Sequence, residues 1–127
     1  MRAPTTRARA GTAASDAVLP DETRLVSHAE AEATFRGEDT YAICSALAAA
    51  ALTDWDRTWL EKWCVSLAGH EQLPVRQISA TCLGHLARRF RQLDQPSLNA
   101  LQELRNDPAV RTYAEDALED VRLSVER

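Results

Sequence analysis

Apolar residues recur every three or four positions from about Ser27 to the C-terminus, and this spacing predicts helices. The strict apolar/polar alternation that would predict strands is almost absent. Turn-forming residues separate the periodic segments from one another. The six predicted helices span about 28–36, 39–52, 53–68, 74–92, 95–104 and 107–124.

The residues at the helix ends support these boundaries. Ser27, followed three residues later by a glutamate, forms the pattern of a capping box. Gly37 suits the left-handed residue that often ends a helix. Thr53 begins a second pattern of the capping-box kind, and Asp107 followed by Pro108 is a typical N-cap and first helical residue. We therefore expect the third helix to begin at Thr53 and the sixth at Asp107.

The fourth and sixth predicted helices repeat one pattern 35 residues apart. A helix-pair repeat of about this length is typical of stacked helical arrays. Six helices with short connections therefore predict an all-α fold of about three antiparallel hairpins that bury their apolar sides by stacking. The repeated residues are Val75, Arg76, Leu83 and Leu86, followed by Val110, Arg111, Leu118 and Val121.

The composition divides the chain into two parts. Residues 1–26 contain two prolines, a glycine and many small residues, and show no amphipathic period. Residues 1–15 are rich in arginine and lack acids, as some targeting segments do, but we interpret residues 1–26 as a flexible, disordered leader. Residues 27–127 form the predicted helical domain.

Charge and hydropathy exclude several classes of function. The net charge of −4 argues against general binding of nucleic acid, which needs clustered positive charge. No run of 18 apolar residues occurs, so we expect no membrane span. The three cysteines lie in helical, mostly apolar contexts and indicate reduced, buried thiols in a cytoplasmic protein.

The repeated pattern resembles the second helix of a HEAT repeat. Residues 74–76 and 107–111 place proline, valine and arginine at its first turn, and residues 82–87 continue it. The resemblance covers about residues 39–124. It implies a short right-handed solenoid whose first hairpin is a degenerate terminal repeat, because residues 38–41 lack the proline and the arginine.

A narrower resemblance rests on three stretches, namely Asp54-Trp55 with Trp59, residues 80–88 and residues 115–120. Together they are similar to a family of small bacterial HEAT-like proteins. Some members of that family are immunity proteins encoded beside polymorphic or contact-dependent toxins. The resemblance implies a protein partner, which would be a basic toxin domain.

Three tryptophans, Trp55, Trp59 and Trp63, stand four residues apart in the third predicted helix. Trp63 lies beside Leu60 and Cys64 on the expected core stripe, so we interpret it as structural. Trp55 and Trp59 lie at the edge of that stripe. Either they anchor a partner, as exposed tryptophans often do, or they pack against the neighbouring hairpin.

Four acidic residues on the last helix form a candidate partner-binding face. Like charges four residues apart repel each other weakly, so the set would suit a basic partner. Alternatively it is a solvated face that is neutralised by Arg88 or Arg89 of the preceding hairpin. The four residues are Glu115, Asp116, Glu119 and Asp120.

His85 and Arg88 on the fourth helix complete the candidate partner-binding residues. Cys82 and His85 are two potential ligands, too few for a metal site, and Cys82 falls on the buried stripe, so we expect no metal, cofactor or catalytic residue. Arg88, Arg89 and Arg91 could hold an acidic partner or simply complement the helix dipole.

These features favour a non-catalytic binding module, and most specifically an immunity protein that covers a toxin. An adaptor or regulatory subunit of a larger complex is the first alternative. A small HEAT-like enzyme acting on nucleic acid is the second, although such enzymes need more repeats and a basic groove.

Overall fold

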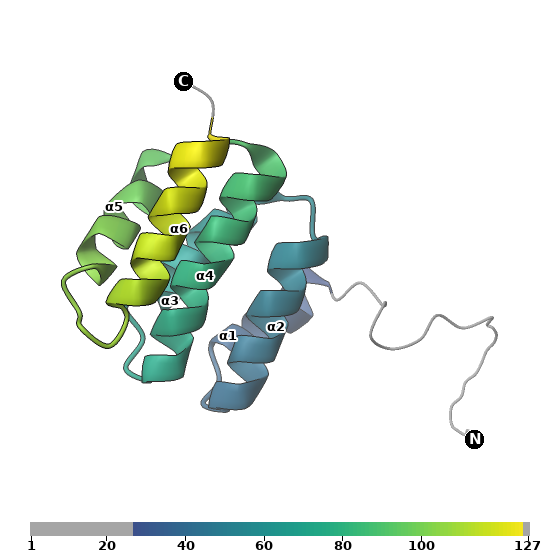
Figure 1. Ribbon diagram of the computed structural model, residues 1–127. Helices are drawn as coiled ribbons and strands as arrows, with labels where there is room; N and C mark the ends of the chain where they lie inside the picture. Colours follow the sequence, from purple (N-terminus) through teal and green to yellow (C-terminus); the bar gives the residue numbers. More distant parts are fainter. Residues whose placement is uncertain (1–26, 126–127) are drawn as a thin grey trace, which may run out of the picture.

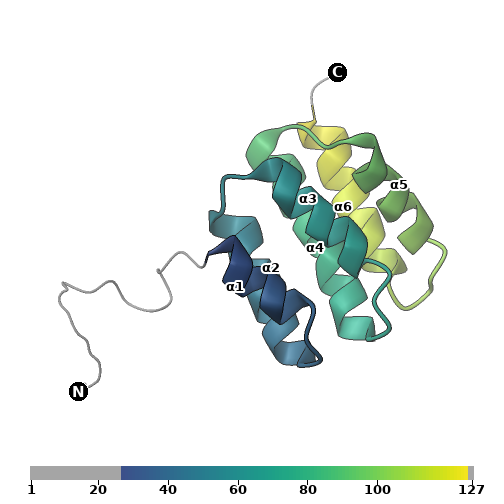
Figure 2. The ribbon, with the colours of Figure 1, turned by 180° about the vertical axis from the view of Figure 1, so that it is seen from behind.

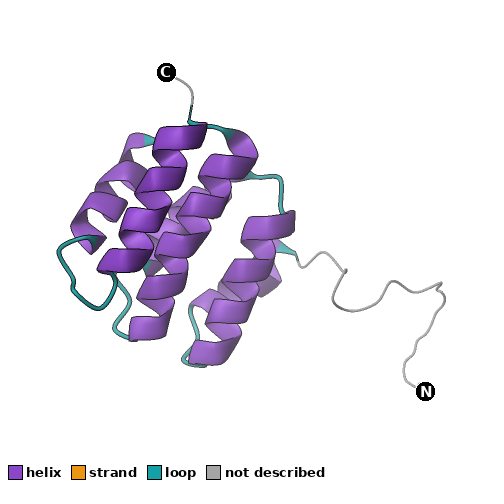
Figure 3. Cartoon of the chain, in the orientation of Figure 1, coloured by secondary structure: helices purple, strands orange, loops and turns teal. Residues whose placement is uncertain are grey.

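The computed structural model describes residues 27–125, and every regular element in that range is a helix (Figure 3). The predicted leader, residues 1–26, lies outside the described residues. None of the described helices combines the length and the apolar character needed to cross a membrane. The helices are α1 His28–Phe35, α2 Thr40–Thr53, α3 Arg57–Leu67, α4 Leu73–Phe90, α5 Gln95–Leu104 and α6 Arg111–Ser124.

The six described helices form three hairpins, α1–α2, α3–α4 and α5–α6, which stack in two layers (Figures 1 and 2). Helices α2, α4 and α6 make one layer, in which α4 packs between the other two. Helices α1, α3 and α5 make the second layer, and α3 contacts both α4 and α5. This arrangement confirms the predicted all-α fold of three stacked hairpins.

The ends of α1 and α4 use different residues from those that were predicted. The capping box of Ser27 and Glu30 is formed as expected. Gly37 is not left-handed, because no glycine in the described range has a positive φ. Its N–H instead bonds the carbonyl oxygen of Thr34 at 3.0 Å in a tightened last turn. The left-handed residue is Arg91, which ends α4 with φ 57°.

Two predicted helix starts were also wrong. Thr53 is the last residue of α2, where its hydroxyl donates to the carbonyl of Ala49. The N-cap of α3 is Asp56, whose carboxylate accepts the N–H of Trp59 at 3.1 Å. Asp107 accepts the N–H of Ala109 in a turn, and α6 begins only at Arg111. Asp56 caps α3 itself, whereas Asp107 organises a turn before α6, so Trp55 and Val110 lie outside these helices.

The 35-residue repeat predicted from the sequence also appears in the side-chain contacts of Arg76 and Arg111. Arg76 donates to the carbonyl of His70, and Arg111 donates to the carbonyl of Arg105, so each arginine reaches six residues back. Arg76 also pairs with Asp107 at 3.3 Å and thereby links the second hairpin to the third. Arg76 therefore bridges adjacent hairpins, whereas Arg111 bonds a carbonyl within its own hairpin.

The layer of α2, α4 and α6 is held together by small and medium-sized buried side chains. Leu47, Cys82 and Ala117 are buried at 35-residue intervals, and the thiol of Cys82 donates to the carbonyl of Leu47. Gly84 lies where α4 meets α6. A Cβ at Gly84 would stand 3.2 Å from the Cα of Ala117 and 2.8 Å from a carboxylate oxygen of Asp120. The two helices therefore approach too closely for a larger residue.

Replacing Gly84 with valine should force α4 and α6 apart. We expect Gly84→Val to lower the free energy of unfolding by about 1–3 kcal/mol, the usual cost of overpacking. The matched control is Gly69→Val, because the nearest atom to a Cβ there is 3.9 Å away. Urea unfolding followed by circular dichroism measures both variants. Equal stability losses would show that the close approach at Gly84 does not matter.

Candidate partner-binding surface

Trp59 and Trp63 join the first two hairpins through one carboxylate. Both indole N–H groups donate to the same oxygen of Glu32 on α1, at 2.7 Å and 3.2 Å. Phe35 packs against both rings, with centroids 6.0 Å and 5.1 Å away. Trp63 is buried, as was predicted, and Trp59 is half-buried. The structure thus places Trp59 in the packing between hairpins, which was the alternative to a role as a partner anchor.

The imidazole of His28 covers the other side of Trp59. The two rings are parallel within 2° and their centroids are 3.7 Å apart. Nε2 of His28 lies 2.9 Å from a carboxylate oxygen of Asp54, in the connection between α2 and α3. Trp59 is therefore fixed from both sides. The donated indole bonds also lower the pKa of Glu32, that from Trp59 most and that from Trp63 next, and nearby cations act in the same direction.

Glu32→Gln should weaken the docking of α1 on α3. Because its pKa is lowered in the folded state, Glu32 contributes its full stabilisation above the ordinary glutamate pKa of about 4.3. That contribution is lost as the pH falls through the lower folded value. Unfolding of the wild type and of Glu32→Gln is followed by tryptophan fluorescence. The difference between their free energies of unfolding should be largest near neutral pH and should shrink towards zero in acid. A difference independent of pH would contradict this; Glu103→Gln, at an exposed position on α5, is the control.

Trp55 lies outside the helical stripe in which it was expected. It precedes the Asp56 cap, stands in the α2–α3 connection, and is 80% exposed. The guanidinium of Arg89 lies 4.9 Å from its ring centroid, and the ring of Phe90 meets it edge-on at 6.3 Å. Arg89 is itself held by the carbonyl of Ala51 at 2.7 Å. Trp55 is thus an exposed aromatic side chain supported from below by fixed groups.

His85, Arg88 and Asp120 form a bridge between α4 and α6. Arg88 donates to Asp120 and also contacts Nδ1 of His85. Burial of the imidazole lowers the pKa of His85, the charge of Arg88 lowers it further, and Asp120 opposes both. Neutral His85 that accepts at Nδ1 carries its proton on Nε2. Arg88 therefore neutralises Asp120, as one of the two sequence interpretations proposed.

The acidic set on α6 divides into paired and unpaired carboxylates. Glu119 receives both Nε and Nη2 of Arg122, at 3.0 Å and 2.6 Å, and this side-chain hydrogen bonding lowers the pKa of Glu119. Glu115 and Asp116 are exposed, and within residues 27–125 neither makes an ion pair. Asp116 lies one turn before Asp120 and on the same side of α6. Only part of the acidic face is therefore neutralised internally.

These contacts place most of the predicted residues on one side of the molecule. Trp55 rests on the last turn of α4, and the Arg88–Asp120 bridge joins that part of α4 to α6. We call this region the α4–α6 surface and define it by Trp55, His85, Arg88, Asp116 and Asp120. Glu115 and Glu119 flank it on α6, whereas Trp59 lies in the other layer.

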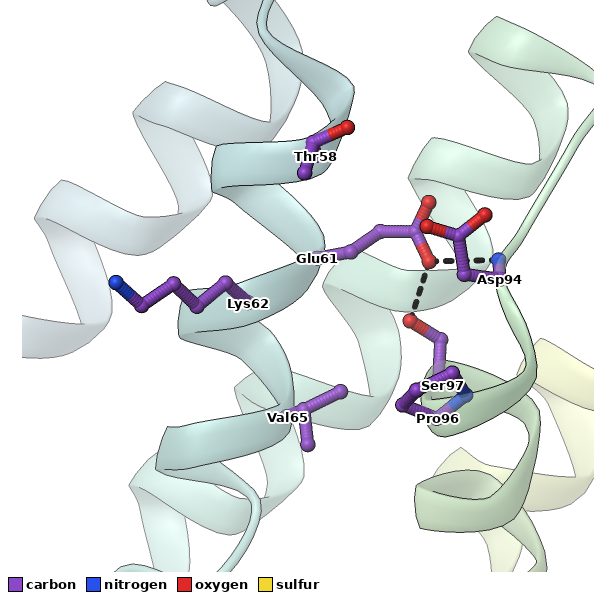
Figure 4. Close-up of a pocket in the computed structure, with 7 residues that line it drawn as sticks. All are labelled: Thr58, Glu61, Lys62, Val65, Asp94, Pro96 and Ser97. Carbon is purple, nitrogen blue, oxygen red and sulfur yellow. Dashed lines mark hydrogen bonds between the residues drawn. The ribbon is translucent and has the colours of Figure 1, made fainter.

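A buried carboxylate that the sequence interpretation missed lies between α3 and α5. Glu61 is 3% exposed and accepts the backbone N–H of Asp94 at 2.9 Å and the hydroxyl of Ser97 (Figure 4). Its other oxygen pairs with Arg57, which also reaches Asp94. Asp94 provides no side-chain cap for α5, so Glu61 of α3 caps that helix instead. The only sequence signal was a glutamate next to the apolar residue Leu60.

Glu61 also forms one wall of a recess of about 320 Å³ on the outer side of α3 and α5 (Figure 4). Val65 and Pro96 supply much of its apolar lining. Glu61 already accepts hydrogen bonds from the backbone N–H of Asp94 and the hydroxyl of Ser97. The ammonium of Lys62 is directed away from Glu61 and Ser97 (Figure 4). The recess therefore presents an apolar hollow with few polar groups that converge on it.

Glu61→Ala should be strongly destabilising, because it leaves Arg57 and the first turn of α5 without their buried acceptor. We expect a loss of about 3–5 kcal/mol in the free energy of unfolding, as for other buried pairs that lose one member. Glu71→Ala, at an exposed position, should change it by less than about 0.5 kcal/mol. Chemical unfolding measures both. A small loss at Glu61 would show that α5 is held by its apolar contacts alone.

Comparison with known proteins identifies a solved structure that is similar to this protein in sequence and in fold. The sequence matches no protein-family profile and no curated protein. Among solved structures, a chain of the "Crystal structure of CDI complex from Cupriavidus taiwanensis LMG 19424" superposes with a TM-score of 0.70. The two sequences are 32% identical, and the match covers 78% of this chain and 89% of that one. The protein belongs to the same family as that chain of the CDI complex. The finding confirms the resemblance to a kind of small helical protein that includes toxin immunity proteins.

Proposed function

We propose that the protein is a non-catalytic immunity protein that neutralises a toxin by binding it and covering its working surface. The relationship to a chain of a CDI complex carries this proposal. Contact-dependent inhibition complexes include immunity proteins, and a small helical chain suits that role. The partner is then another protein, as the sequence resemblance also implied.

The chemistry of the described residues supports binding rather than catalysis. The buried titratable groups hold helices together: Glu61 caps α5, and Cys82 bonds the backbone of α2. Burial raises the pKa of the Cys44 thiol, and the pKa of the Cys64 thiol is raised well above its usual range by its hydrogen bond with Cys82 and by burial. Neutral buried thiols are poor nucleophiles.

The α4–α6 surface has the properties of a protein interface. Trp55 offers a large exposed aromatic ring that Arg89 and Phe90 hold in place, so little side-chain entropy is lost when it is buried. Asp116 and Glu115 supply negative charge that has no internal partner in the described range. A basic toxin surface would be attracted to these carboxylates and would bury the exposed ring of Trp55 in the contact.

The protein should form a stable complex with the toxin domain encoded beside its own gene. Trp55→Ala should raise the Kd of that complex by about 30-fold or more, the effect of losing an aromatic hot spot. Asp116→Lys should mainly slow association and reduce its dependence on salt. Surface plasmon resonance at two salt concentrations measures both effects. Lys62→Ala, at an exposed position in the other layer, is the control and should change neither rate.

Two results would contradict the proposal. One is a toxin domain that does not bind the wild-type protein. The other is a complex whose affinity falls with Lys62→Ala and not with Trp55→Ala, because that result would place the interface on the layer of α1, α3 and α5.

A further inference from the structure

Helix α2 has a composition that a solvent-facing helix rarely has. It lies at the end of its layer, with α4 on one side and no further helix of the described chain beyond it (Figure 1). None of its 14 residues is charged, although 27% of the whole sequence is. Tyr41 is 82% exposed and Leu52 is 58% exposed. A helix face that is both apolar and exposed marks a contact surface.

The exposed residues of α2 follow the spacing of a helix–helix seam. Tyr41, Ser45, Ala48 and Leu52 are separated by four, three and four residues, and therefore lie along one side of the helix. Ser45 is exposed and Ala48 is half-buried. The four positions have the same spacing whether they are counted from the start or from the end of α2, and their midpoint lies between Ala46 and Leu47. Large residues occupy both ends of the seam and small residues occupy its centre.

We propose that this seam packs against the same seam of a second copy of the chain, with the two α2 helices antiparallel across a two-fold axis. In this pairing Tyr41 contacts the partner's Leu52, and Ser45 contacts the partner's Ala48. The small central residues let the two helices approach closely, and the large residues close both ends. A two-fold contact needs a patch that is complementary to itself, and a seam with symmetric spacing, a large residue at each end and small residues between them meets that need.

The charge distribution favours a second copy over the toxin as the occupant of this face. The two halves of a two-fold contact carry the same charges, so a seam charged with one sign would repel its copy, whereas the uncharged seam of α2 does not. A basic toxin is matched by the carboxylates of α6 and gains nothing electrostatic from α2. Trp55, the residue of the α4–α6 surface that is nearest to the seam in sequence, follows the end of α2 and is held by Arg89 of α4. The dimer therefore does not depend on the proposed function.

The size of the seam predicts a weak dimer. A helix of 14 residues is about 21 Å long, since each residue adds about 1.5 Å. A contact along one such helix covers less than the roughly 800 Å² per partner of a standard interface. We therefore expect a dissociation constant in the micromolar range or above.

Sedimentation velocity of the full chain, from about 1 µM to about 1 mM, tests this dimer. The wild type should shift from monomer to dimer within that range. Leu52→Glu should weaken dimerisation about 10-fold or more, because it places a charge at both ends of the seam. Leu123→Glu introduces the same change at a residue on α6 that is 63% exposed, and should leave dimerisation unchanged. Circular dichroism confirms that each variant is folded.

A charge pair tests the antiparallel register. Tyr41→Lys and Leu52→Glu should each weaken the dimer, and the two together should restore most of the lost affinity, since each new lysine then faces the partner's new glutamate. Failure of the double variant to restore affinity would overturn the register. A wild-type chain that stays monomeric throughout the concentration series would overturn the proposed dimer. This holds also if Leu52→Glu weakens the toxin complex, because that result would place the α2 seam in the toxin interface.

Discussion

Two carboxylates in the layer of α1, α3 and α5 hold the three hairpins in their stack. Glu32 on α1 accepts both indole N–H groups of α3, and Glu61 on α3 accepts the N–H and hydroxyl groups at the start of α5. Each helix of this layer therefore binds the next through a carboxylate acceptor. A buried or half-buried carboxylate destabilises the fold unless its oxygens accept hydrogen bonds. These bonds therefore fix both the register of neighbouring hairpins and the distance between them.

The opposite layer gains its rigidity in another way. Small residues bring α6 close to Gly84 of α4, and the repeat of 35 residues places equivalent positions in equivalent contacts. A rigid layer can present Trp55 and the carboxylates of α6 at fixed separations without ordering them at the moment of binding. Pre-organisation of this kind would favour tight binding of the proposed toxin partner through a limited surface.

The sequence allowed the six helices and the repeat to be predicted, because each depends on local spacing. It failed where two local signals compete, as at Thr53, where Asp56 three residues later is the actual cap. It also failed where a polar residue gains its role from a distant element. Glu32 and Glu61 each stand next to a core residue and look like ordinary surface glutamates until the neighbouring helix is placed. For Trp59 the sequence left two interpretations open, and the choice between them needed the position of α1, which supplies its contacts.

Binding by occlusion differs from chemical inactivation in its stoichiometry, and this difference allows the most direct test. Increasing amounts of the protein are added to a fixed concentration of the toxin domain, well above the Kd, and the remaining toxin activity is measured. Occlusion predicts a linear fall to zero that ends at one protein per toxin. Complete loss of activity at a small fraction of that ratio would indicate catalysis, and undiminished activity at saturation would show that the bound surface is not the one the toxin uses.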